Sequence, residues 1–342
     1  MRVLQVMAGA GHGGAEAFFC RLVPALSCAG VDQRAAIRAN PERAASLRAA
    51  GVDTVQMPFG GLLDLTTRLR LKREIARFRP TIVMSWMNRA TLSCPRGRFI
   101  HVGRLGGYYD LKYYRRCDHL IANTRDIARY LVENGVAADR VHYVPNFVTE
   151  APAEAAARHV FTTPDDAPVV LAMGRLHPNK AFDVLLDALA EVPNAILWLA
   201  GEGPERPRLE RKVRQLGIGS RVRFLGWRED VNALLRAADV FVCPSRHEPL
   251  GNVVLEAWAQ AVPVVAAASQ GPASLIRHRH DGLLVARDDA GALAEAIREV
   301  LSAPRLAAAL ALKGRASYEA GFTQAKVVER FVDLFERIGG RG

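Results

Sequence analysis

A chain of 342 residues, 50% hydrophobic and 7% aromatic, is long enough for two ordinary domains and has the composition of a soluble globular protein. No apolar run approaches the roughly 18 to 20 residues that cross a bilayer, and the N-terminal MRVLQVMAGAGHGG indicates a first strand and its loop rather than a signal peptide. The five cysteines show no C-x-x-C pair, which disfavours a zinc site and a disulfide framework. We therefore expect a cytoplasmic location.

The formal net charge of +11 is concentrated in one half of the chain. Residues 1–150 contain 22 Lys and Arg against 12 Asp and Glu, whereas residues 151–342 contain 24 against 23. A basic half suits a nucleic acid, an anionic membrane surface or an acidic acceptor, and the alternative is a set of solvated arginines. Because no RNA-recognition motif, helix-turn-helix or zinc finger is present, we expect no nucleic-acid partner.

Short apolar runs alternate with amphipathic ones, which is the βαβ rhythm of parallel sheets. Helices are predicted at 15–29 and 67–78. Strands are predicted at 2–8, 54–58, 81–86, 98–104, 119–124 and 140–146, and, in the second half, at 169–175, 195–201, 221–226, 240–245, 263–268 and 282–285.

A stretch rich in Pro, Ala and acidic residues, 149–168, separates the two series of strands and is the predicted linker. Two α/β units imply a cleft between them, with ligands at the carboxyl ends of the strands. The last predicted helix, about 324–338, has an apolar stripe that must pack on a neighbour, although periodicity does not say which domain receives it.

The stretch AGAGHGGAE, residues 8–16, has glycines at the G-x-G-x-x-G spacing between a predicted strand and a predicted helix. Such glycines let backbone amides approach an anion at the helix N-terminus. The acidic residue that would bind a ribose is missing, because Asp32 precedes QRAAI instead of closing a second strand. A dinucleotide site is therefore the less favoured interpretation.

Two cations follow the first strand of the second half, in GRLHPNKAFDVLLDAL. Arg175 would grip a phosphate with paired donors and Lys180 would act as a point charge. A solvated basic loop is the alternative. The position at the mouth of the inferred cleft favours phosphate binding.

The stretch HEPLGNVVLEAW, residues 247–258, places two carboxylates around the predicted start of a helix. Amides of Gly251, Asn252 and Val253 would meet phosphate, while Glu248 and Glu256 would accept hydrogen bonds from sugar hydroxyls. The alternative is an ordinary helix start with two solvated glutamates, which the nearby Arg175 and Lys180 make less favoured.

No D-x-D motif is present to hold a divalent metal. The charge of a departing diphosphate would then be neutralised by Arg175, Lys180 and a helix dipole, so we expect a transfer that needs neither a metal nor another cofactor.

These motifs, together with LAGEGPERPRLE, VRFLGWREDVNALLRAADVFVCPS and DGLLV, resemble glycosyltransferase family 4, over nearly the whole chain. The resemblance implies the α/β fold called GT-B, with two Rossmann-like, doubly wound domains facing a central cleft. An acceptor-binding domain would span 1–150 and a nucleotide-sugar-binding domain 165–323. The C-terminal helix, 324–342, would pack back on the first domain.

Roles follow from the resemblance residue by residue. Arg175 and Lys180 would contact the donor diphosphate, Glu256 the ribose and Glu248 the transferred sugar near its reacting carbon. The remaining donor-binding positions would be Gly13, Gly14, Gly226, Trp227, Leu250, Gly251, Asn252 and Val253.

The chain departs from the family pattern at two places. Ala181 replaces the glycine that usually follows the lysine. The histidine that the family often carries at the end of a first-domain strand has two counterparts here, because FIHVGRLGG places His101 inside the predicted strand and Arg104 near its end. A catalytic role for His101 competes with a packed core position.

The first half would supply the acceptor site. SWMNRAT and RLGGYYDLKYYRR combine cations with tyrosines, a surface that suits an acidic saccharide or, alternatively, a protein partner. The expected acceptor contacts are Arg89, Arg104, Tyr108 and Lys112.

We therefore predict a retaining hexosyltransferase that uses a UDP or GDP sugar and a glycan or glycolipid acceptor in envelope polysaccharide or lipopolysaccharide assembly. The resemblance also implies peripheral contact with the anionic inner membrane. The alternatives are a non-catalytic nucleotide-sugar-binding protein and an epimerase or phosphorylase of the same fold.

Overall fold

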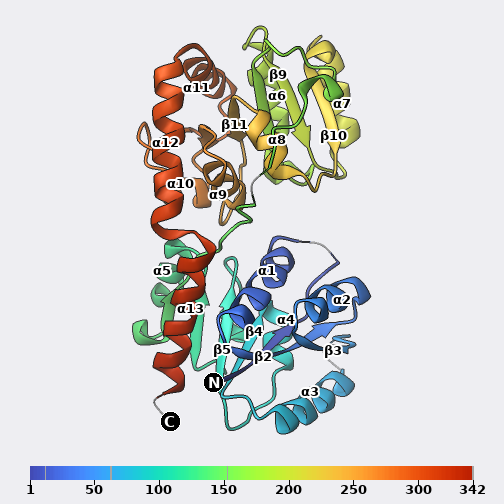
Figure 1. The fold of residues 1–342 in the computed structure, drawn as a ribbon, viewed down its shortest axis with the longest axis vertical. Helices are drawn as coiled ribbons and strands as arrows, with labels where there is room; N and C mark the ends of the chain where they lie inside the picture. Colours follow the sequence, from blue (N-terminus) through green and yellow to red (C-terminus); the bar gives the residue numbers. More distant parts are fainter. Residues whose placement is uncertain (12, 62–63, 152, 341–342) are drawn as a thin grey trace. The chain divides into compact units, whose positions relative to one another are not determined.

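The structure, a computed structural model, describes residues 1–11, 13–61, 64–151 and 153–340. The chain forms two compact units, each with its own core (Figure 1). Unit 1 contains Met1–Phe147 and Gln324–Gly342, and unit 2 contains Val148–Thr323.

The described residues of unit 1 form a seven-stranded parallel sheet in the order β3-β2-β1-β4-β5-β6-β7. The strand order reverses between β1 and β4, as in doubly wound folds. The strands are β1 (Arg2–Met7), β2 (Asp32–Arg38), β3 (Asp53–Met57), β4 (Ile82–Trp86), β5 (Ile100–Leu105), β6 (His119–Ala122) and β7 (Val141–Tyr143). Sequence reasoning did not predict β2, whose segment DQRAAIR has a single β-branched residue.

Helices cover both faces of this sheet (Figure 1). Alternate strand residues face opposite layers, so that Val3 packs with α1 (Gly14–Cys28), α2 (Pro41–Ala49) and α13 (Gln324–Gly339), whereas Leu4 packs with α3 (Leu65–Phe78) and α4 (Met87–Ser93). A further helix, α5 (Arg125–Glu133), lies against β6 and β7.

The C-terminal helix α13 packs on unit 1, the arrangement that the family resemblance implies. Its apolar stripe is buried with residues of α1 and β1 in one core, and the stripe residues are Val327, Val328, Phe331, Leu334, Phe335 and Ile338. Burial of this stripe, rather than helix propensity, holds the chain end in place.

The described residues of unit 2 form a six-stranded parallel sheet in the order β10-β9-β8-β11-β12-β13, the same winding as in unit 1. The strands are β8 (Val169–Met173), β9 (Ile196–Ala200), β10 (Val222–Gly226), β11 (Val240–Cys243), β12 (Val264–Ala267) and β13 (Leu283–Val285). Each of these lies within a run that the sequence predicted as a strand.

Helices also form two layers in unit 2. One layer packs around Leu197 and holds α6 (Phe182–Ala190), α7 (Arg206–Gln215) and α11 (Ala290–Ser302). The other packs around Trp198 and holds α8 (Val231–Ala237) and α9 (Asn252–Ala259). The remaining helices are α10 (Gln270–Leu275) and α12 (Pro304–Gly321). Among the described residues, no helix combines the length and the apolar character needed to span a membrane.

The predicted linker, 149–168, is part of unit 2. Arg158 donates to the carbonyl oxygens of Ala237 (2.8 Å) and Ala167 (3.1 Å) and pairs with Asp239 (3.0 Å), while Glu150 accepts from Tyr318 (2.9 Å). Its Pro and Ala content indicated the break between the strand series, but not these contacts, because their partners lie far along the chain.

The loops after β8 and β9 approach so closely that only glycine fits. Gly201 has φ +143°, and a Cβ there would lie 1.9 Å from the carbonyl oxygen of Gly174. The amide of Gly174 donates to Ala200 (3.0 Å) and that of Gly201 to Gly226 (2.7 Å), which ties together the turns that end three neighbouring strands.

We expect Gly201→Ala to lower the free energy of unfolding by about 3 kcal/mol or more, because the added methyl group meets rigid backbone at a left-handed φ. Urea unfolding followed by circular dichroism measures the change. Gly217→Ala is the control: Gly217 also has positive φ (+68°) but has open space around it, so its cost should be about 1 kcal/mol. Equal costs for the two variants would contradict the close approach.

Candidate active site

The candidate site lies at the carboxyl ends of β8 and β11, where the strand order of unit 2 reverses. The loop after β8 carries Arg175 and Lys180, and the loop after β11 carries Glu248 and leads into α9. The topology thus brings together two motifs that are about seventy residues apart in the sequence. This edge of the sheet is the place where doubly wound domains bind their ligands.

Lys180 and Glu248 form an ion pair through Nζ and Oε2. Both side chains are largely buried, with 22% and 13% of their surface exposed. Burial by itself lowers the pKa of Lys180, but the charge and hydrogen bond of Glu248, with the charge of Glu256, raise that pKa above its ordinary value. The ammonium is therefore positively charged, and it is paired with the carboxylate of Glu248.

Ala181 adopts the left-handed conformation, with φ 52° and ψ 35°, and its side chain is fully buried. It ends the turn that carries Lys180 and begins α6. The family's usual glycine would adopt this conformation without strain, so the departure at this position keeps the turn at a small conformational cost.

The start of α9 is built around Gly251, which has φ +82° and caps the helix. Its amide lies 3.4 Å from Oε1 of Glu248, and the backbone carbonyl of Glu248 accepts from Gly271 (2.7 Å). Leu250 is buried beneath the turn, and Asn252 and Val253 form the first turn of α9. The carboxylate and the backbone of Glu248 are thus both held in place.

The other predicted donor-binding residues of unit 2 lie at the same sheet edge. Gly226 ends β10 with φ +69°, and Trp227 follows it with 68% of its surface exposed. Arg175 is exposed, and no described residue pairs with it. An exposed cation, a buried cation and a helix N-terminus around one edge can together stabilise a diphosphate. Among the described residues, no cluster of three His, Cys, Asp or Glu side chains could hold a metal ion.

The glycine loop of unit 1 is filled by the chain's own carboxylate. Oε1 of Glu16 accepts from the amide of Ala10 (2.7 Å), and a Cβ at Gly13 would lie 2.3 Å from Oε2 of the same side chain. Gly14 is the first residue of α1. Asp32 opens β2 instead of closing it, so the acidic residue of a dinucleotide site is missing. A dinucleotide site is therefore disfavoured both by the Glu16 carboxylate in the loop and by the position of Asp32.

His101 is the second residue of β5, near the amino end of the strand, and only 5% of it is exposed. Its Nε2 lies 2.8 Å from the hydroxyl of Ser85, in the interior of unit 1. Ligands of such sheets bind at the opposite, carboxyl ends. The structure therefore makes His101 a packed core residue, and the catalytic role expected for it loses its geometric basis.

Arg104 does lie near the carboxyl end of β5, but its side chain is 2% exposed. The guanidinium stacks on Phe18 and Trp86, at 4.6 and 4.5 Å from the ring centroids, and donates to Asn146. Burial lowers its pKa to about 9. The expected acceptor contact from Arg104 is thus corrected to an interior position.

The other expected acceptor contacts lie on the surface of unit 1. Arg89 is exposed on α4, while Tyr108 and Lys112 follow β5. The hydroxyl of Tyr108 donates to Asp126, and Lys112 pairs with Asp110 (2.6 Å). Because each polar group already has a partner in the chain, an acceptor would have to compete with these contacts.

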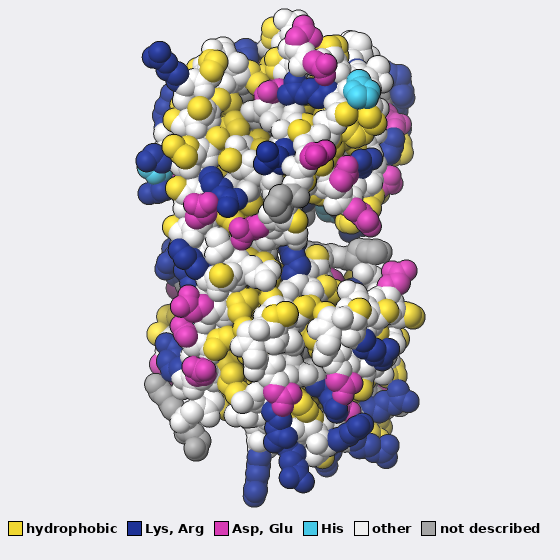
Figure 2. All heavy atoms as spheres, in the orientation of Figure 1, with side chains coloured by type: hydrophobic (Ala, Val, Ile, Leu, Met, Phe, Trp, Pro, Cys, Tyr) yellow, Lys and Arg dark blue, Asp and Glu magenta, His cyan; other side chains and the backbone are white. Residues whose placement is uncertain are grey.

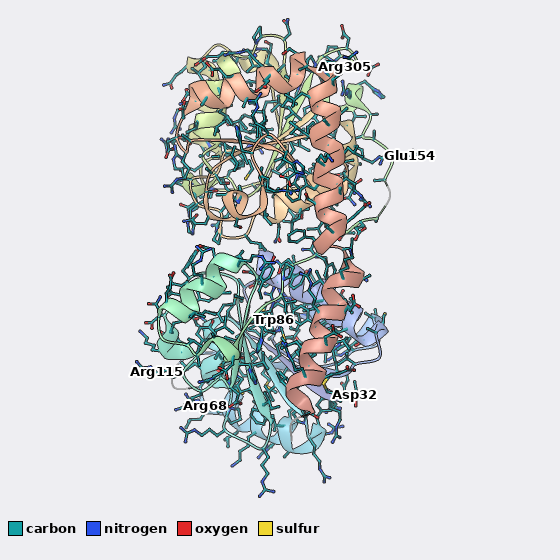
Figure 3. All side chains as sticks on the ribbon, turned by 90° about the vertical axis from the view of Figure 1, so that its left-hand side faces the viewer. Asp32, Arg68, Trp86, Arg115, Glu154 and Arg305 are labelled. Carbon is teal, nitrogen blue, oxygen red and sulfur yellow. The ribbon has the colours of Figure 1, made fainter. Side chains whose placement is uncertain are left out.

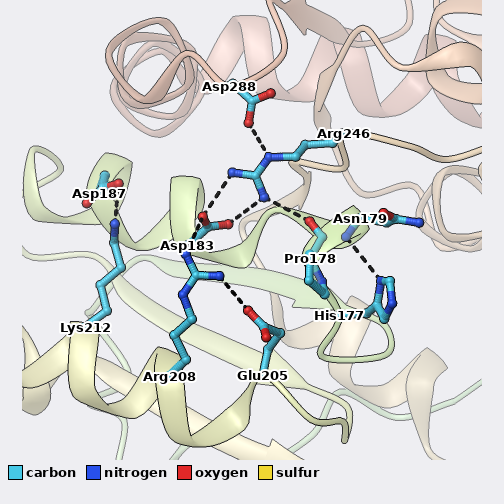
Figure 4. A network of polar contacts seen from close by, with 10 residues as sticks. All are labelled: His177, Pro178, Asn179, Asp183, Asp187, Glu205, Arg208, Lys212, Arg246 and Asp288. Carbon is cyan, nitrogen blue, oxygen red and sulfur yellow. Dashed lines mark hydrogen bonds and ion pairs between the residues drawn. The ribbon is translucent and has the colours of Figure 1, made fainter.

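Sequence reasoning missed a network that joins the site loops. Arg246, two residues before Glu248, bonds Asp183, Asp288 and the carbonyl of Pro178 (Figure 4). Only the proximity of Arg246 to Glu248 in the sequence could have drawn attention to it, since Asp183 lies in α6 and Asp288 follows β13. Glu16 was missed as well, although it stands within the quoted glycine motif.

Comparison with known proteins places the chain in a family. Residues 12–151 match the model described as Glycosyltransferase Family 4, and residues 167–303 match Glycosyl transferases group 1. The lipopolysaccharide core biosynthesis glycosyltransferases LpsE and LpsD of Rhizobium meliloti (strain 1021) are each 37% identical to the chain. The match to LpsE covers 94% of this chain and 95% of LpsE, and the match to LpsD covers 98% of both.

The chain belongs to glycosyltransferase family 4. The family predicted from the motifs is thereby confirmed, and the protein is a glycosyltransferase.

Solved structures confirm the GT-B fold. A glycosyltransferase from Rickettsia africae ESF-5 matches with a TM-score of 0.90 and 17% identity, over 100% of this chain and 99% of that one. HepE of Anabaena, solved in complex with UDP, matches with a TM-score of 0.83 and 20% identity, over 98% of this chain and 100% of HepE.

We expect the stability of this glycosyltransferase to fall in mild acid because of His101. Burial lowers its pKa to about 4 from an ordinary value of about 6.5, so between these values the unfolded chain binds a proton that the folded chain does not. The neutral, buried state of His101 contributes about 3 kcal/mol to the free energy of unfolding, which is present above pH 6.5 and is lost as the pH falls toward 4. Urea unfolding of wild type and His101→Gln across this range measures it.

His142 provides a matched comparison, because burial and the charges of His119 and Arg337 lower its pKa to about 4 as well. His101→Gln should remove only part of the pH dependence of the free energy of unfolding, and His142→Asn should remove a further part. An unchanged pH dependence in His101→Gln would contradict the buried, neutral state of His101.

Proposed function

We propose that this family 4 enzyme transfers a hexose-type sugar, with retention of anomeric configuration, from a nucleoside diphosphate sugar to a glycan or glycolipid hydroxyl. The observation that carries the proposal is the Lys180–Glu248 pair beside exposed Arg175 and the start of α9. One edge of the unit 2 sheet thus offers cations for a diphosphate and carboxylates for sugar hydroxyls.

Each residue would have a distinct role. Arg175 and Lys180 would neutralise the leaving diphosphate together with the amides at the start of α9, so that no divalent metal is needed. Glu256 would accept hydrogen bonds from the ribose, and Glu248 from the transferred sugar. Gly226 and Trp227 would lie beside the base.

In the transfer, the bond between the anomeric carbon and the phosphate oxygen breaks as the acceptor oxygen bonds to the same face of that carbon. The proton of the acceptor hydroxyl passes to the departing phosphate. Glu248 would orient the sugar and would not act as the nucleophile, since its carboxylate is already paired with Lys180.

Envelope glycan assembly is the biological setting that we favour. LpsE and LpsD, the full-length relatives, are named for lipopolysaccharide core biosynthesis. The UDP complex of HepE supports a UDP sugar over a GDP sugar as the donor. The acceptor would contact unit 1, where exposed Arg89, Tyr108 and Lys112 remain the candidate residues.

The proposal includes peripheral contact with the cytoplasmic face of an anionic membrane through α3. Unit 1 carries 26 Lys and Arg against 14 Asp and Glu, whereas unit 2 carries 20 against 21. Figure 2 shows Lys and Arg gathered at the end of unit 1 where Figure 1 places α3, and Figure 3 shows Arg68 and Arg115 on the outside of unit 1. Exposed leucines accompany the exposed cations of α3, which are Arg68, Arg70, Lys72, Arg73 and Arg77.

The donor site is tested by thermal unfolding with UDP, GDP, ADP, CMP and their common sugar conjugates, in buffer containing EDTA. One nucleoside diphosphate family should stabilise the protein selectively, by about 2.7 kcal/mol at 100 times its Kd. Lys180→Ala and Glu256→Ala should each strongly reduce the stabilisation measured at the same nucleotide concentration. Lys212→Ala, which breaks the Lys212–Asp187 pair (2.6 Å) between α7 and α6, is the control and should keep it.

If none of the nucleotides stabilises the protein, either in EDTA or with a divalent metal added, the proposed donor site is overturned. Stabilisation that appears only with added metal would overturn metal independence alone. With a donor in hand, the coupling constant of the anomeric proton in the product distinguishes retention from inversion, and tight donor binding without transfer to any envelope glycan would favour a non-catalytic binding protein.

The membrane contact is tested by sedimentation with phosphatidylcholine vesicles, with and without phosphatidylglycerol. Changing Arg68, Arg73 and Arg77 to Glu should weaken binding to the anionic vesicles about a hundredfold or more, since each cation contributes about 1 kcal/mol. The control reverses three exposed arginines of unit 2, Arg211, Arg214 and Arg305, and should change binding little. Equal losses in the two variants would show that net charge, and not α3, is responsible.

A further inference from the structure

Two loops of unit 2 lie side by side in one register at the candidate donor site. The segment 178–180 follows β8 and the segment 246–248 follows β11. Three successive residues of one contact three successive residues of the other, always 68 positions apart. The contacts are Arg246 Nη1 to Pro178 O (2.9 Å), His247 N to Asn179 O (3.2 Å) and Lys180 Nζ to Glu248 Oε2.

Arg246, which makes the first of these contacts, also bonds two acidic residues (Figure 4). Its guanidinium makes a bidentate pair with Asp183, at 2.8 and 3.0 Å, and its Nε donates to Asp288. Asp183 lies in the first turn of α6, and Asp288 follows β13. One side chain therefore joins the loops after β8, β11 and β13.

The geometry needs an arginine. A guanidinium presents a rigid, planar set of donors, so it can bond a carboxylate with two nitrogens and still reach a carbonyl and a second acid. Burial by itself raises the pKa of Asp183, but the hydrogen bonds and charge of Arg246 hold it below its ordinary value. The pair is thus ionised, and a lysine could replace only part of it.

The Arg246 network lies two residues from the groups proposed to bind the donor. Glu248 and Lys180 are at the other end of the same paired segments. If Arg246 released its loop, the backbone that carries Glu248 would lose its attachment to Pro178, and the carboxylate and ammonium would no longer be presented together. A loss of about 1 Å in such alignment can cost about a hundredfold in rate.

We propose that Arg246 is a positioning residue of the donor site: it holds the segment 246–248 against 178–180, so that Lys180 and Glu248 are already aligned when the nucleotide binds. The inference rests on the proposed function, because it assumes that Lys180 and Glu248 bind the donor. Arg246 acts through the loops and does not itself touch the donor.

The test is titration calorimetry with UDP and GDP on wild type, Arg246→Lys, Lys180→Met and the double variant. Arg246→Lys should weaken the binding of the nucleotide that wild type prefers about tenfold. In the Lys180→Met background the same substitution should change Kd less than about twofold, because the group that Arg246 positions has been removed. Thermal unfolding of each variant verifies that it is folded.

Arg208→Lys is the matched control. Within the described residues, Arg208 bonds acidic side chains, Glu205 (2.9 Å) and Asp183 (3.9 Å), so it shares the network but not the two segments. The Kd of the Arg208→Lys variant for the preferred nucleotide should stay within about twofold of the wild-type value. If Arg246→Lys does not fold, Asp288→Ala removes one of the hydrogen bonds of Arg246 and should weaken binding in the same direction.

The outcomes separate the two hypotheses. Failure of wild type to bind UDP or GDP, together with no stabilisation by any other nucleotide of the thermal unfolding test, would overturn the proposed function. Binding by wild type with an unchanged Kd in Arg246→Lys would overturn the positioning role alone. An equal loss of affinity on introducing Arg246→Lys into wild type and into Lys180→Met would also overturn the positioning role, because Arg246 would then act independently of the Lys180–Glu248 pair.

Discussion

The buried ion pair between Lys180 and Glu248 is the interaction on which the proposed donor site depends. Removing two charges from water is costly, and the pair is retained only if its surroundings supply further polar contacts. Here the neighbouring charge of Glu256, the amide of Gly251 and the contacts of Arg246 provide them. The surroundings keep a lysine ammonium charged in a largely buried position, which is the state that a diphosphate requires.

The two units share one winding but present different chemistry. In unit 2 the loops at the point of strand reversal carry charged residues around exposed Arg175. In unit 1 the corresponding glycine loop is closed by Glu16, and the end of β5 is closed by the stacking of Arg104 on Phe18 and Trp86. Unit 1 instead exposes its cations on the outside, on α3 and on the segment after β5. The same fold thus carries the proposed donor site on one unit and a basic surface on the other.

Prediction from sequence succeeded where local pattern and chemistry agree. Every strand of unit 2 lies in a predicted apolar run, and the predicted stripe of α13 is buried as a whole. It failed for β2, where tertiary pairing with β1 and β3 overrides a weak strand propensity. It also failed for His101 and Arg104, because the direction of a strand's side chains and the depth of their burial depend on the layers that cover the sheet.

The sequence by itself determined the family and the α/β class. It also indicated Arg175, Lys180, Glu248 and Glu256 as candidate site residues, because each stands in a local motif whose spacing reflects a turn or a helix start. Only the tertiary structure decided how these motifs meet. The contacts that align Lys180 with Glu248 join residues 68 positions apart, and the acids that hold Arg246 come from the first turn of α6 and from the loop after β13. No local pattern encodes such contacts, because they exist only once parallel strands bring the ends of distant segments to one edge of the sheet.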